Sequence, residues 1–596
     1  MDKKNTTIGV LLLMAAFASV YLGQHNAPPR PTEPLPTANQ TTSESAAVQA
    51  PTAPTASSTL SANTPFAVAA PAAAAASTAR LENEFVVVNF TNQGGAVRDV
   101  ALKKYAAVID RPEPFVFNAL HADPMLAFVD FPGLDRTASY EVVSQTSREI
   151  VYRATFDNRI EVTRRYSLVA QPDKQHDPYV IRHETTFRNL TDQIVPLPRV
   201  ALSLGTAAAT SVKDIQVTTG FSNGEDQDFI NRSDLEGGSG FFGIGASEQK
   251  PLINTGGPVV WSSISNQFFA TILTPDLPAA GMVSRRVKLI PDAFDNNHLA
   301  YGLTSATQFD LTPLAPNGET KLGADFFVGP REYRRLSNSD VFKLNQDKVM
   351  QFGFFKYFSQ ILISLMSWIH DWFPDAKWAW GYAIVLTTLF LKIVFVPFTL
   401  AASRSAKRMQ KIQPEMQAVR EKFKDNPQKL QAATMELFKK HKVNPMGGCL
   451  PILITIPFFI GFFQMLQSTA ELRFQPFLWA SDLSAPDTVA VVFGLPINIM
   501  PVLMGATMVI QMRLTPSPTM DNAQAKMMKF MPYIFALFCY TFSCALALYS
   551  TVNGIFTIGQ QMVINRMKDP TPVAAPAPAP ATGGKGMKNV TPKKKR

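Results

Sequence analysis

Five apolar runs in the last third of the chain constrain its fold more than any other feature. They cover residues 380–401, 449–466, 495–512, 530–542 and 545–564, and Lys392 is the only charged residue in them. Such runs are typical of membrane-spanning helices, although some are short for a hydrocarbon core of about 30 Å. A sixth run, residues 8–22, follows Lys3 and Lys4 and is either a cleaved signal peptide or a retained anchor. A poor cleavage site favours an anchor over residues 1–23, which predicts six spans.

The charges between these runs predict which loops face the cytoplasm. Residues 403–447 carry eleven basic and four acidic side chains, whereas residues 467–494 carry one basic and three acidic side chains. Basic loops stay in the cytoplasm, so the first of these loops is inside and the second is outside. The tail, residues 566–596, ends in four basic residues and is also inside. Six spans with both termini in the cytoplasm satisfy these signs, and they place the region between the first two spans in the periplasm of a Gram-negative cell.

That periplasmic region changes its pattern near residue 81. Residues 24–80 are rich in Pro, Ala, Ser and Thr and are expected to form a disordered tether. Residues 81–340 instead alternate apolar and polar side chains in short runs separated by turn residues, which predicts a large antiparallel β-sandwich. Asp157 and Asn158 predict a tight hairpin turn. The expected strands are residues 85–90, 149–156, 159–170, 179–188, 268–273 and 321–328.

Residues 350–373 have aromatic and aliphatic side chains at helical spacing, with Lys356, Gln360 and His370 among them. This pattern is typical of an amphipathic helix that lies in the membrane interface. An ordinary amphipathic helix docked on protein has the same pattern. The position just before the first apolar run of the C-terminal third favours the interfacial interpretation.

Lys392 is the residue that points to chemistry. It precedes Arg404, where the basic loop begins, by twelve residues, which is roughly 18 Å along a helix. A charge at that depth is costly and normally faces the bundle interior or a water-filled cavity. No other span contains an acidic partner. Lys392 therefore either reaches the interface by snorkelling or presents a positive charge in a hydrated pocket, to which Thr387 and Thr388 would add hydroxyl groups.

The basic loop at 403–447 is predicted to form a helical hairpin. Residues 406–423 and 428–440 both have helical spacing, and Asp425, Asn426 and Pro427 separate them. The hairpin is either a solvated stalk that sets topology or a mobile element near the pocket. The basic tail suits contact with anionic lipid or with the phosphates of ribosomal RNA, although such tails often only fix topology.

Enzyme motifs are absent or out of context. The sequence has no P-loop and no pair of histidines at helical zinc spacing. Residues 220–224 match the Gly-x-Ser-x-Gly pattern, but the acidic sequence that follows is typical of a loop rather than of the helix that a nucleophile elbow requires. The three cysteines all lie in apolar C-terminal segments, which argues against a disulfide framework or a thiolate metal site. We expect no catalytic residue, no metal and no cofactor.

Several motifs resemble the YidC membrane protein insertases of the YidC/Oxa type. The resemblance rests on the sequence from Val443 to Ile454, on Ile456 to Phe459, and on Glu471-Leu472-Arg473. It extends to Met531-Pro532, Leu548-Tyr549 and Gln560-Gln561, and Asn92-Gln93-Gly94-Gly95 resembles the large periplasmic domain of Gram-negative members. The segment 542–545, Phe-Ser-Cys-Ala, departs from the family pattern, so the turn between the last two spans is expected to differ in shape.

The resemblance implies an α-helical polytopic inner-membrane protein with a five-helix insertase core at 380–565 and a periplasmic β-sandwich. It implies a hydrophilic groove in which Lys392 replaces the arginine of the family, so the charge remains and the bidentate fork is lost. The expected partners are nascent membrane proteins, the Sec translocon, the ribosome and membrane lipid, and the chain is expected to work as a monomer. The expected groove residues are Lys392, Thr387, Thr388, Tyr549 and Ser550, and those of the cytoplasmic hairpin are Arg404, Lys407, Arg408 and Lys411.

Two other classes of function stay open. A secondary transporter of a small acidic solute would contain repeated halves and broken helices, and the sequence has no such repeat. A sugar-binding or mutarotase-like enzyme built on the β-domain is allowed by fold analogy alone.

Overall fold

The computed structural model describes residues 77–566, apart from 121–122, 130, 132–134, 170–175, 212–213, 215, 238–247, 290–299, 425, 442–449 and 515–521. Inside helices it leaves undescribed the side chains of 404–406, 410, 450–456 and 522–529. The predicted signal anchor, nearly all of the tether and nearly all of the tail lie outside the described residues. Cys449 and the motif that begins at Val443 also lie largely outside them.

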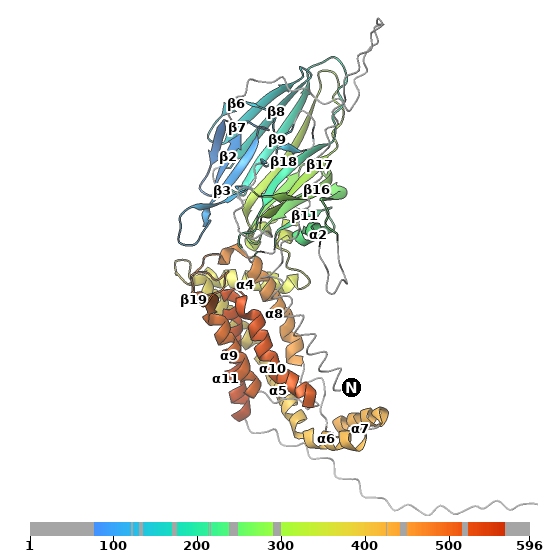
Figure 1. Ribbon diagram of the computed structural model, residues 1–596, viewed down its shortest axis with the longest axis vertical. Coiled ribbons are helices and arrows are strands. Elements are labelled where there is room, and N and C mark those ends of the chain that lie inside the picture. The colour runs from blue at the N-terminus through green and yellow to red at the C-terminus, as the bar shows by residue number, and fades with distance from the viewer. Residues whose placement is uncertain are drawn as a thin grey trace, which may run out of the picture.

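The described strands before residue 331 form three antiparallel sheets (Figure 1). Their orders are β1-β2-β3-β4, β13-β16-β17-β10-β5 and β12-β11-β14-β15-β18-β9-β8-β7-β6. The first nine strands are β1 Thr78–Glu82, β2 Val86–Thr91, β3 Ala96–Ala106, β4 Pro114–Phe117, β5 Phe128–Val129, β6 Glu141–Gln145, β7 Glu149–Phe156, β8 Ile160–Leu168 and β9 Val180–Asn189. The others are β10 Val200–Ala207, β11 Thr218–Ser222, β12 Gln227–Asn231, β13 Leu252–Val259, β14 Trp261–Ser265, β15 Phe269–Pro275, β16 Ala279–Lys288, β17 Tyr301–Phe309 and β18 Glu319–Pro330.

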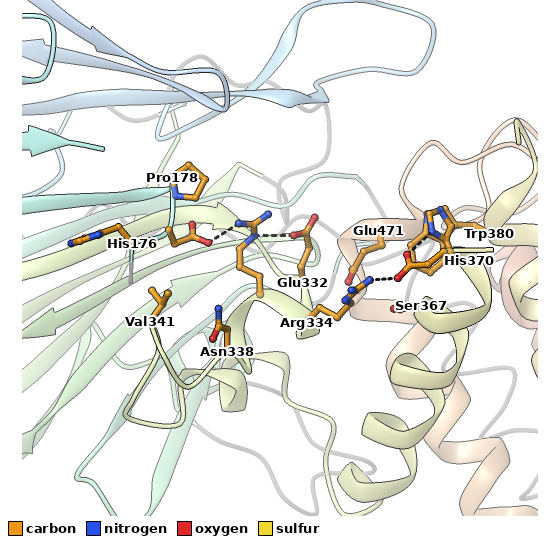
Figure 2. A pocket seen from close by; sticks show the side chains of 13 residues that line it. His176, Pro178, Glu332, Arg334, Asn338, Val341, Ser367, His370, Trp380 and Glu471 are labelled. Carbon is orange, nitrogen blue, oxygen red and sulfur yellow. Dashed lines mark hydrogen bonds and ion pairs between the residues drawn. The ribbon is translucent and has the colours of Figure 1, made fainter. Parts of the chain in front are cut away.

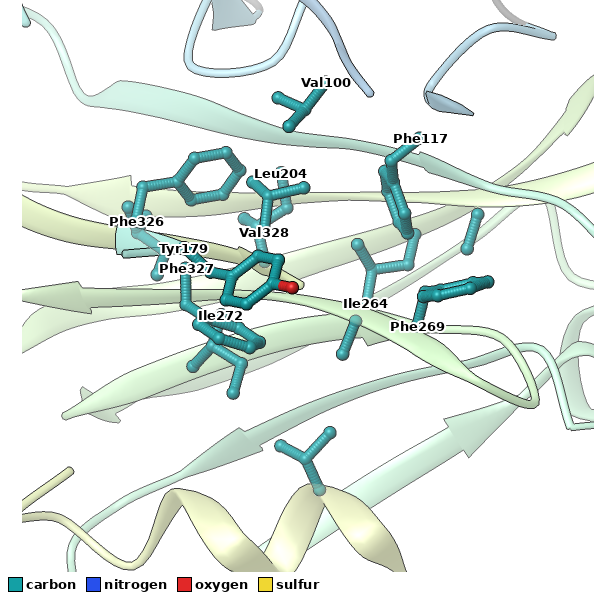
Figure 3. Close-up of a cluster of buried hydrophobic side chains, with 14 of the residues drawn as sticks. Val100, Phe117, Tyr179, Leu204, Ile264, Phe269, Ile272, Phe326, Phe327 and Val328 are labelled. Carbon is teal, nitrogen blue, oxygen red and sulfur yellow. The ribbon is translucent and has the colours of Figure 1, made fainter. Parts of the chain in front are cut away.

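The predicted β-sandwich is confirmed. Strand β10 of the five-stranded sheet packs on β14 and β15 of the nine-stranded sheet, and large apolar side chains fill the space between strands (Figure 3). Hydroxyl pairs also join these two sheets, with 2.7 Å between Thr219 and Ser284. The four-stranded sheet packs on β8 through Phe90, whose ring lies 5.1 Å from that of Tyr166. Burial of these apolar side chains is the main stabilising term in the domain.

The sequence predicted some strands well and missed others for a physical reason. Strand β7 has the predicted bounds, and Asp157 and Asn158 both have positive φ, as a tight hairpin turn requires. The expected strand at 159–170 is shorter in the structure, at Ile160–Leu168. Strand β10 was missed because all eight of its residues are buried, so its sequence does not alternate.

The remaining elements include the long helices of the C-terminal half. The short helices are α2 Arg232–Glu236, α3 Tyr333–Leu336, η1 Gln346–Met350, η3 Ala470–Leu472 and η4 Cys539–Thr541. The longer helices are α4 Lys356–His370, α5 Ala379–Lys411, α6 Gln413–Lys422, α7 Pro427–Lys440, α8 Leu450–Ser468, α9 Ile499–Leu514, α10 Asn522–Phe538 and α11 Cys544–Arg566, and the hairpin β19 Thr488–Val492 with β20 Leu495–Asn498 precedes α9.

Three predicted helix boundaries were wrong. The helix expected across 350–373 is α4 alone, because Gln351 and Gly353 have positive φ and interrupt any earlier helix. The span expected at 380–401 and the start of the hairpin helix expected at 406 are one continuous helix, α5, which runs through Pro397. A new helix, α6, begins only at Gln413, because Pro414 suits the first turn of a helix and not its interior.

Two predicted spans also changed. The run expected at 495–512 begins with strand β20, and its helix α9 starts at Ile499. The run expected at 530–542 starts earlier, at Asn522, and its α-helix ends at Phe538 before the 3-10 turn η4. Figure 1 shows the β-domain at one end of the helical bundle, α4 close to that end, and α6 and α7 at the opposite end.

Candidate functional site

Helix α5 carries Lys392. Of the described helices, one is both long and apolar enough to cross a bilayer, and it is the segment Ala379–Met409 of α5. The helices Ile499–Leu514 and Phe530–Thr541 are apolar but shorter. Large apolar side chains of α5, including Phe390, Ile393 and Phe398, are more than half exposed. Water would penalise such a surface and lipid would not, so the exposure favours a membrane setting for this helix.

The Lys392 ammonium reaches across to helix α11. Its Nζ donates a hydrogen bond of 2.8 Å to Oγ1 of Thr557, and the lysine side chain is half-buried. Among the described residues, no carboxylate pairs with Lys392. A neutral hydroxyl satisfies one of the three donors of an ammonium and cancels none of its charge. In this part of the chain the observed partner of Lys392 is thus a neutral hydroxyl.

Two more polar contacts continue from Lys392 along the seam between α5 and α11. Gln560 Nε2 donates to Thr399 Oγ1 at 2.5 Å, and Lys407 Nζ donates to the carbonyl of Ile564 at 2.7 Å. Lys392, Thr399 and Lys407 are seven and eight residues apart, so they share one face of α5. The last of these contacts places a cation at the C-terminal end of α11, where the helix dipole favours it.

Thr387 and Thr388 are buried next to the site but do not contact the ammonium. The Thr388 hydroxyl donates 2.7 Å back to the carbonyl of Ile384 in its own helix. The Thr387 hydroxyl is buried and has no hydrogen-bond partner among the described residues. Thr388 lies on the Lys392 face, one turn away, because four residues separate them.

Tyr549 and Ser550 lie two turns from Thr557 on α11. The Tyr549 ring stacks on Phe462 of α8 with 4.2 Å between ring centroids. The hydroxyls of Ser550 and Thr551 are buried and, like that of Thr387, are unpaired among the described residues. Leaving a buried hydroxyl without a hydrogen-bond partner destabilises the fold by about 1–3 kcal/mol. These hydroxyls therefore indicate a place where a water molecule or a polar group of a ligand would be stabilised.

The hairpin expected at 403–447 exists as the end of α5 with α6 and α7. Asn426 caps α7 by accepting a hydrogen bond from the Lys429 amide at 3.1 Å, and His441 contacts Glu415 at 3.0 Å across the hairpin. Of the four basic residues proposed for this element, Arg408 and Lys411 are exposed and Lys407 contacts α11. The side chain of Arg404 lies outside the described residues.

The Glu471-Leu472-Arg473 motif occupies the junction between the β-domain and the helices. The Arg473 guanidinium donates to the carbonyls of Ala106 and Ala107 in the β-domain, at 2.9 Å for the latter. It also lies 5.3 Å from the ring centroid of Phe269, and burial lowers its pKa to about 10. Gln267 adds a hydrogen bond of 2.8 Å to the carbonyl of Gln467. This motif therefore joins the two parts of the described chain.

A cavity of 440 Å³ at this junction contains a network of charged side chains (Figure 2). Arg335 pairs with Asp177 at 2.6 Å and with Glu332 at 2.8 Å, and Arg334 pairs with Asp371 at 2.8 Å. Oε2 of Glu471 is buried and unpaired among the described residues. Burial, and then the negative charge of Glu332, raise the pKa of Glu471 well above its ordinary range. Glu471 is therefore protonated at pH values where most glutamates are charged.

Sequence reasoning did not assign Thr399, Thr557 or Gln560 to the site, although Gln560 belongs to one of the motifs that resemble the family. Each lies in an otherwise apolar helix, and Asn553, Thr557 and Gln560 recur every three or four residues along α11. That spacing predicts a polar stripe, which could have identified the α11 side of the seam. The partner of Lys392 could not be read from it, because only packing brings positions 392 and 557 together.

The Gly-x-Ser-x-Gly match at 220–224 is part of a strand and its turn. Ser222 ends β11, and its hydroxyl donates 3.0 Å to the carbonyl of Asp226 before β12 begins. A strand follows this turn, whereas a nucleophile elbow requires a helix.

Comparison with known proteins identifies the family. The family model described as the YidC periplasmic domain matches residues 78–365, and the model described as 60Kd inner membrane protein matches residues 368–571. The chain belongs to the YidC family. The junction motif and Lys392 both lie within the matched residues.

Curated relatives agree with this assignment. The chain is 42% identical over 258 residues to the membrane protein insertase YidC of Paraburkholderia phymatum, covering 43% of this chain and 44% of the relative. It is 35% identical over 322 residues to that of Geobacter sp. strain M21, covering 53% and 55%. The chain thus spans about half the length of the curated relatives it matches.

Solved structures resemble the chain more distantly. A crystal structure of an active YidC insertase, with its first transmembrane domain resolved, has a TM-score of 0.32 and 16% identity, covering 83% of this chain and 93% of that one. A galactose mutarotase related enzyme from Lactobacillus acidophilus has a TM-score of 0.29 and 11% identity, covering 42% and 97%.

Proposed function

We propose that this chain is a membrane protein insertase that moves nascent membrane proteins into the inner membrane without ATP hydrolysis. Membership of the YidC family and the similarity to proteins named membrane protein insertase YidC support this function. The observation that carries the mechanism is Lys392, a half-buried cation whose described partner is the neutral hydroxyl of Thr557. A cation held in this way keeps its charge available for an acidic segment in transit.

In this mechanism the seam between α5 and α11 receives the polar flank of the client. Lys392 attracts an acidic N-terminal tail or hairpin loop, and the hydroxyls of Thr387 and Ser550, which are unpaired among the described residues, stabilise water or polar groups farther along α5 and α11. Tyr549 lies on α11 next to Ser550, nearer the β-domain than Thr557. The client's apolar segment, about 20 residues long, enters lipid and supplies the driving force. The groove lowers the cost of moving the polar flank across the apolar layer.

The proposed topology follows from the charge pattern. Six spans, a five-helix core and both termini in the cytoplasm place the β-domain in the periplasm and α6 and α7 in the cytoplasm. The basic side chains of Lys407, Arg408 and Lys411, with Arg404 and the tail, are then positioned to meet the ribosome. The Sec translocon is a further proposed partner, membrane lipid surrounds the core, and the chain works as a monomer without a cofactor or a catalytic residue.

A reconstituted insertion assay tests the role of Lys392. Purified protein in liposomes would be given a single-span client with an acidic N-terminal tail, and translocation of the tail would be measured by protease protection. We expect K392E to lower the insertion rate at least about tenfold, because the reversed charge repels the acidic tail. Losing roughly 1.4 kcal/mol of transition-state stabilisation is enough to change a rate tenfold. We expect K392R to retain most of the activity, because it keeps the charge.

Two controls separate charge from folding. K343E makes the same charge change at an exposed position of the periplasmic side and should leave insertion unchanged. A client with a basic tail should be inserted by K392E no worse than by the wild type, because a glutamate at position 392 attracts a basic tail. Insertion of the acidic client by K392E at the wild-type rate would refute the proposed mechanism.

A further inference from the structure

The hairpin of β19 and β20 exposes an apolar surface at its tip. Phe493 is 101% exposed, and Val491 and Leu495 are 66% and 65% exposed. Phe493 and Gly494 both have positive φ and form the tight turn between the strands. The chain carries no charged residue between Asp487 and Arg513. A hairpin in water normally alternates polar and apolar side chains, and this one is apolar on both faces.

Hydrogen bonds at the base of the hairpin fix its orientation. The Tyr540 hydroxyl donates 2.6 Å to the carbonyl of Pro496, and Asn498 Nδ2 donates 2.8 Å to the carbonyl of Tyr540. One Asp487 oxygen accepts hydrogen bonds from Trp479 Nε1 at 2.8 Å and from the Met500 amide at 2.7 Å. The base is therefore tied to η4 and to the start of α9. A rigid base holds the apolar tip away from the rest of the chain.

The hairpin lies at the level where a membrane interface is expected. Figure 1 shows β19 at the end of the bundle nearest the β-domain, close to the level of α4. The outer face of α4 is also apolar and aromatic, since Tyr357, Ile361 and Trp368 are each more than half exposed. Aromatic side chains gather at the boundary between lipid and water. Helix α9, which follows the hairpin directly in the chain, also has exposed apolar side chains, among them Val502 at 56%.

We propose that the tip of the β19–β20 hairpin is buried in phospholipid, at the boundary between headgroups and acyl chains of the outer leaflet. The inference rests on the proposed orientation of the bundle and goes beyond insertase function, because it assigns a lipid-binding role to a loop outside the groove. Phospholipid fits this surface because the hairpin is uncharged, apolar on both faces, and continuous with the lipid-facing helices. The polar base then marks the level at which the chain returns to water.

Spin-label accessibility in nanodiscs that contain one copy of the full chain tests this role. F493C and V491C would be labelled in a background with Cys449, Cys539 and Cys544 replaced by alanine. Lipid-soluble oxygen and a water-soluble nickel chelate then compete to relax each label. We expect oxygen to dominate at 491 and 493 and nickel to dominate at the control E225C, which lies in the exposed turn between β11 and β12.

The outcomes distinguish lipid from other occupants. Nickel access at 493 equal to that at 225 would overturn the proposal. Nickel access at 493 in one-copy nanodiscs that disappears in crowded liposomes would show that a second copy covers the hairpin, and would also overturn it. A preserved thermal unfolding temperature of each labelled protein shows that folding is intact. Loss of insertion by K392E does not depend on the hairpin, so this test and the insertase test fail separately.

Discussion

Lys392 and Arg331 are two poorly exposed cations held in opposite ways. Arg331, at the end of the β-domain, is 1% exposed, and its guanidinium donates to the carbonyls of Asn266, Gln267, Val349 and Met350. Lys392 is half-buried and donates to the hydroxyl of Thr557. Both terminal nitrogens of the guanidinium donate to backbone carbonyls, and only its Nε is unpaired among the described residues, whereas the ammonium keeps two of its three donors uncommitted there.

The difference separates a structural cation from the cation that we propose receives the client. Burial lowers the pKa of Arg331 to about 10, which leaves it charged and bound at neutral pH. Its planar donors join the segment before β15 to η1, and removing them would leave carbonyls unpaired. Lys392 joins only two helices through a hydroxyl, so the fold has little reason to require it. The proposed mechanism requires such a charge, because a cation held by several carbonyls is less free to receive a client.

The largest effect is expected from R331M. Four buried carbonyls would lose their donor, which we expect to cost about 3–5 kcal/mol. At roughly 2–4 °C for each kcal/mol in a domain of this size, the unfolding temperature should fall by about 10 °C. Thermal unfolding in detergent would measure it. R199M is the matched control, because Arg199 and its partner Asp310 are exposed and their pair is worth little. Equal shifts in the two variants would contradict the structural role of Arg331.

A medium effect is expected from R473K, at the junction. Lysine cannot reach both Ala106 and Ala107 or stack on the surrounding rings as a planar group, so we expect a loss of about 2 kcal/mol. Protease cleavage rates between the β-domain and the bundle should rise accordingly. K392R makes the reverse exchange in the bundle and should change neither cleavage nor insertion much. An unchanged cleavage rate in R473K would mean that a positive charge alone suffices at the junction, as we expect it to at position 392.

A smaller effect is expected from pH. Because Glu471 has a raised pKa in the folded chain, its contribution to stability is complete below its unfolded pKa of about 4.3 and decreases as pH rises toward the folded pKa. The folded state binds the extra proton, so unfolding free energy should fall with pH by up to about 1.4 kcal/mol per unit in that window. E471Q should flatten the dependence between pH 5 and pH 8, measured by thermal unfolding, while E225Q should not. An unchanged slope in E471Q would show that Glu471 is ionised throughout.

The smallest effect on stability is expected from K392M. Only the hydrogen bond to Thr557 is lost, and an apolar side chain suits the neighbouring surface, so the change should stay within about 1 kcal/mol in either direction. Insertion of the acidic-tailed client should nevertheless fall, which the liposome assay measures. A loss of stability as large as that of R331M would make Lys392 a structural residue and remove the distinction drawn above.

The sequence predicted most of the elements but not all of their limits. The alternation at 149–156 predicted β7, and helical spacing predicted α7 close to its observed start at Pro427. Strand β10 was missed because it is buried on both faces, and β20 was counted in a span because its residues are as apolar as those of α9. Apolar runs identify burial or lipid contact, and they do not distinguish strand from helix over a few residues.

The sequence by itself determined that one charge, Lys392, lies in apolar helices that lack an acidic residue, because composition needs no geometry. It also determined the β-sandwich, since alternation follows from the two faces of a strand. Tertiary structure alone decided that Thr557 meets Lys392, that Arg473 joins the β-domain to the bundle, and that the hairpin at 488–498 keeps its apolar tip exposed. Each of these depends on residues far apart in the chain, and only packing brings them together or leaves them uncovered.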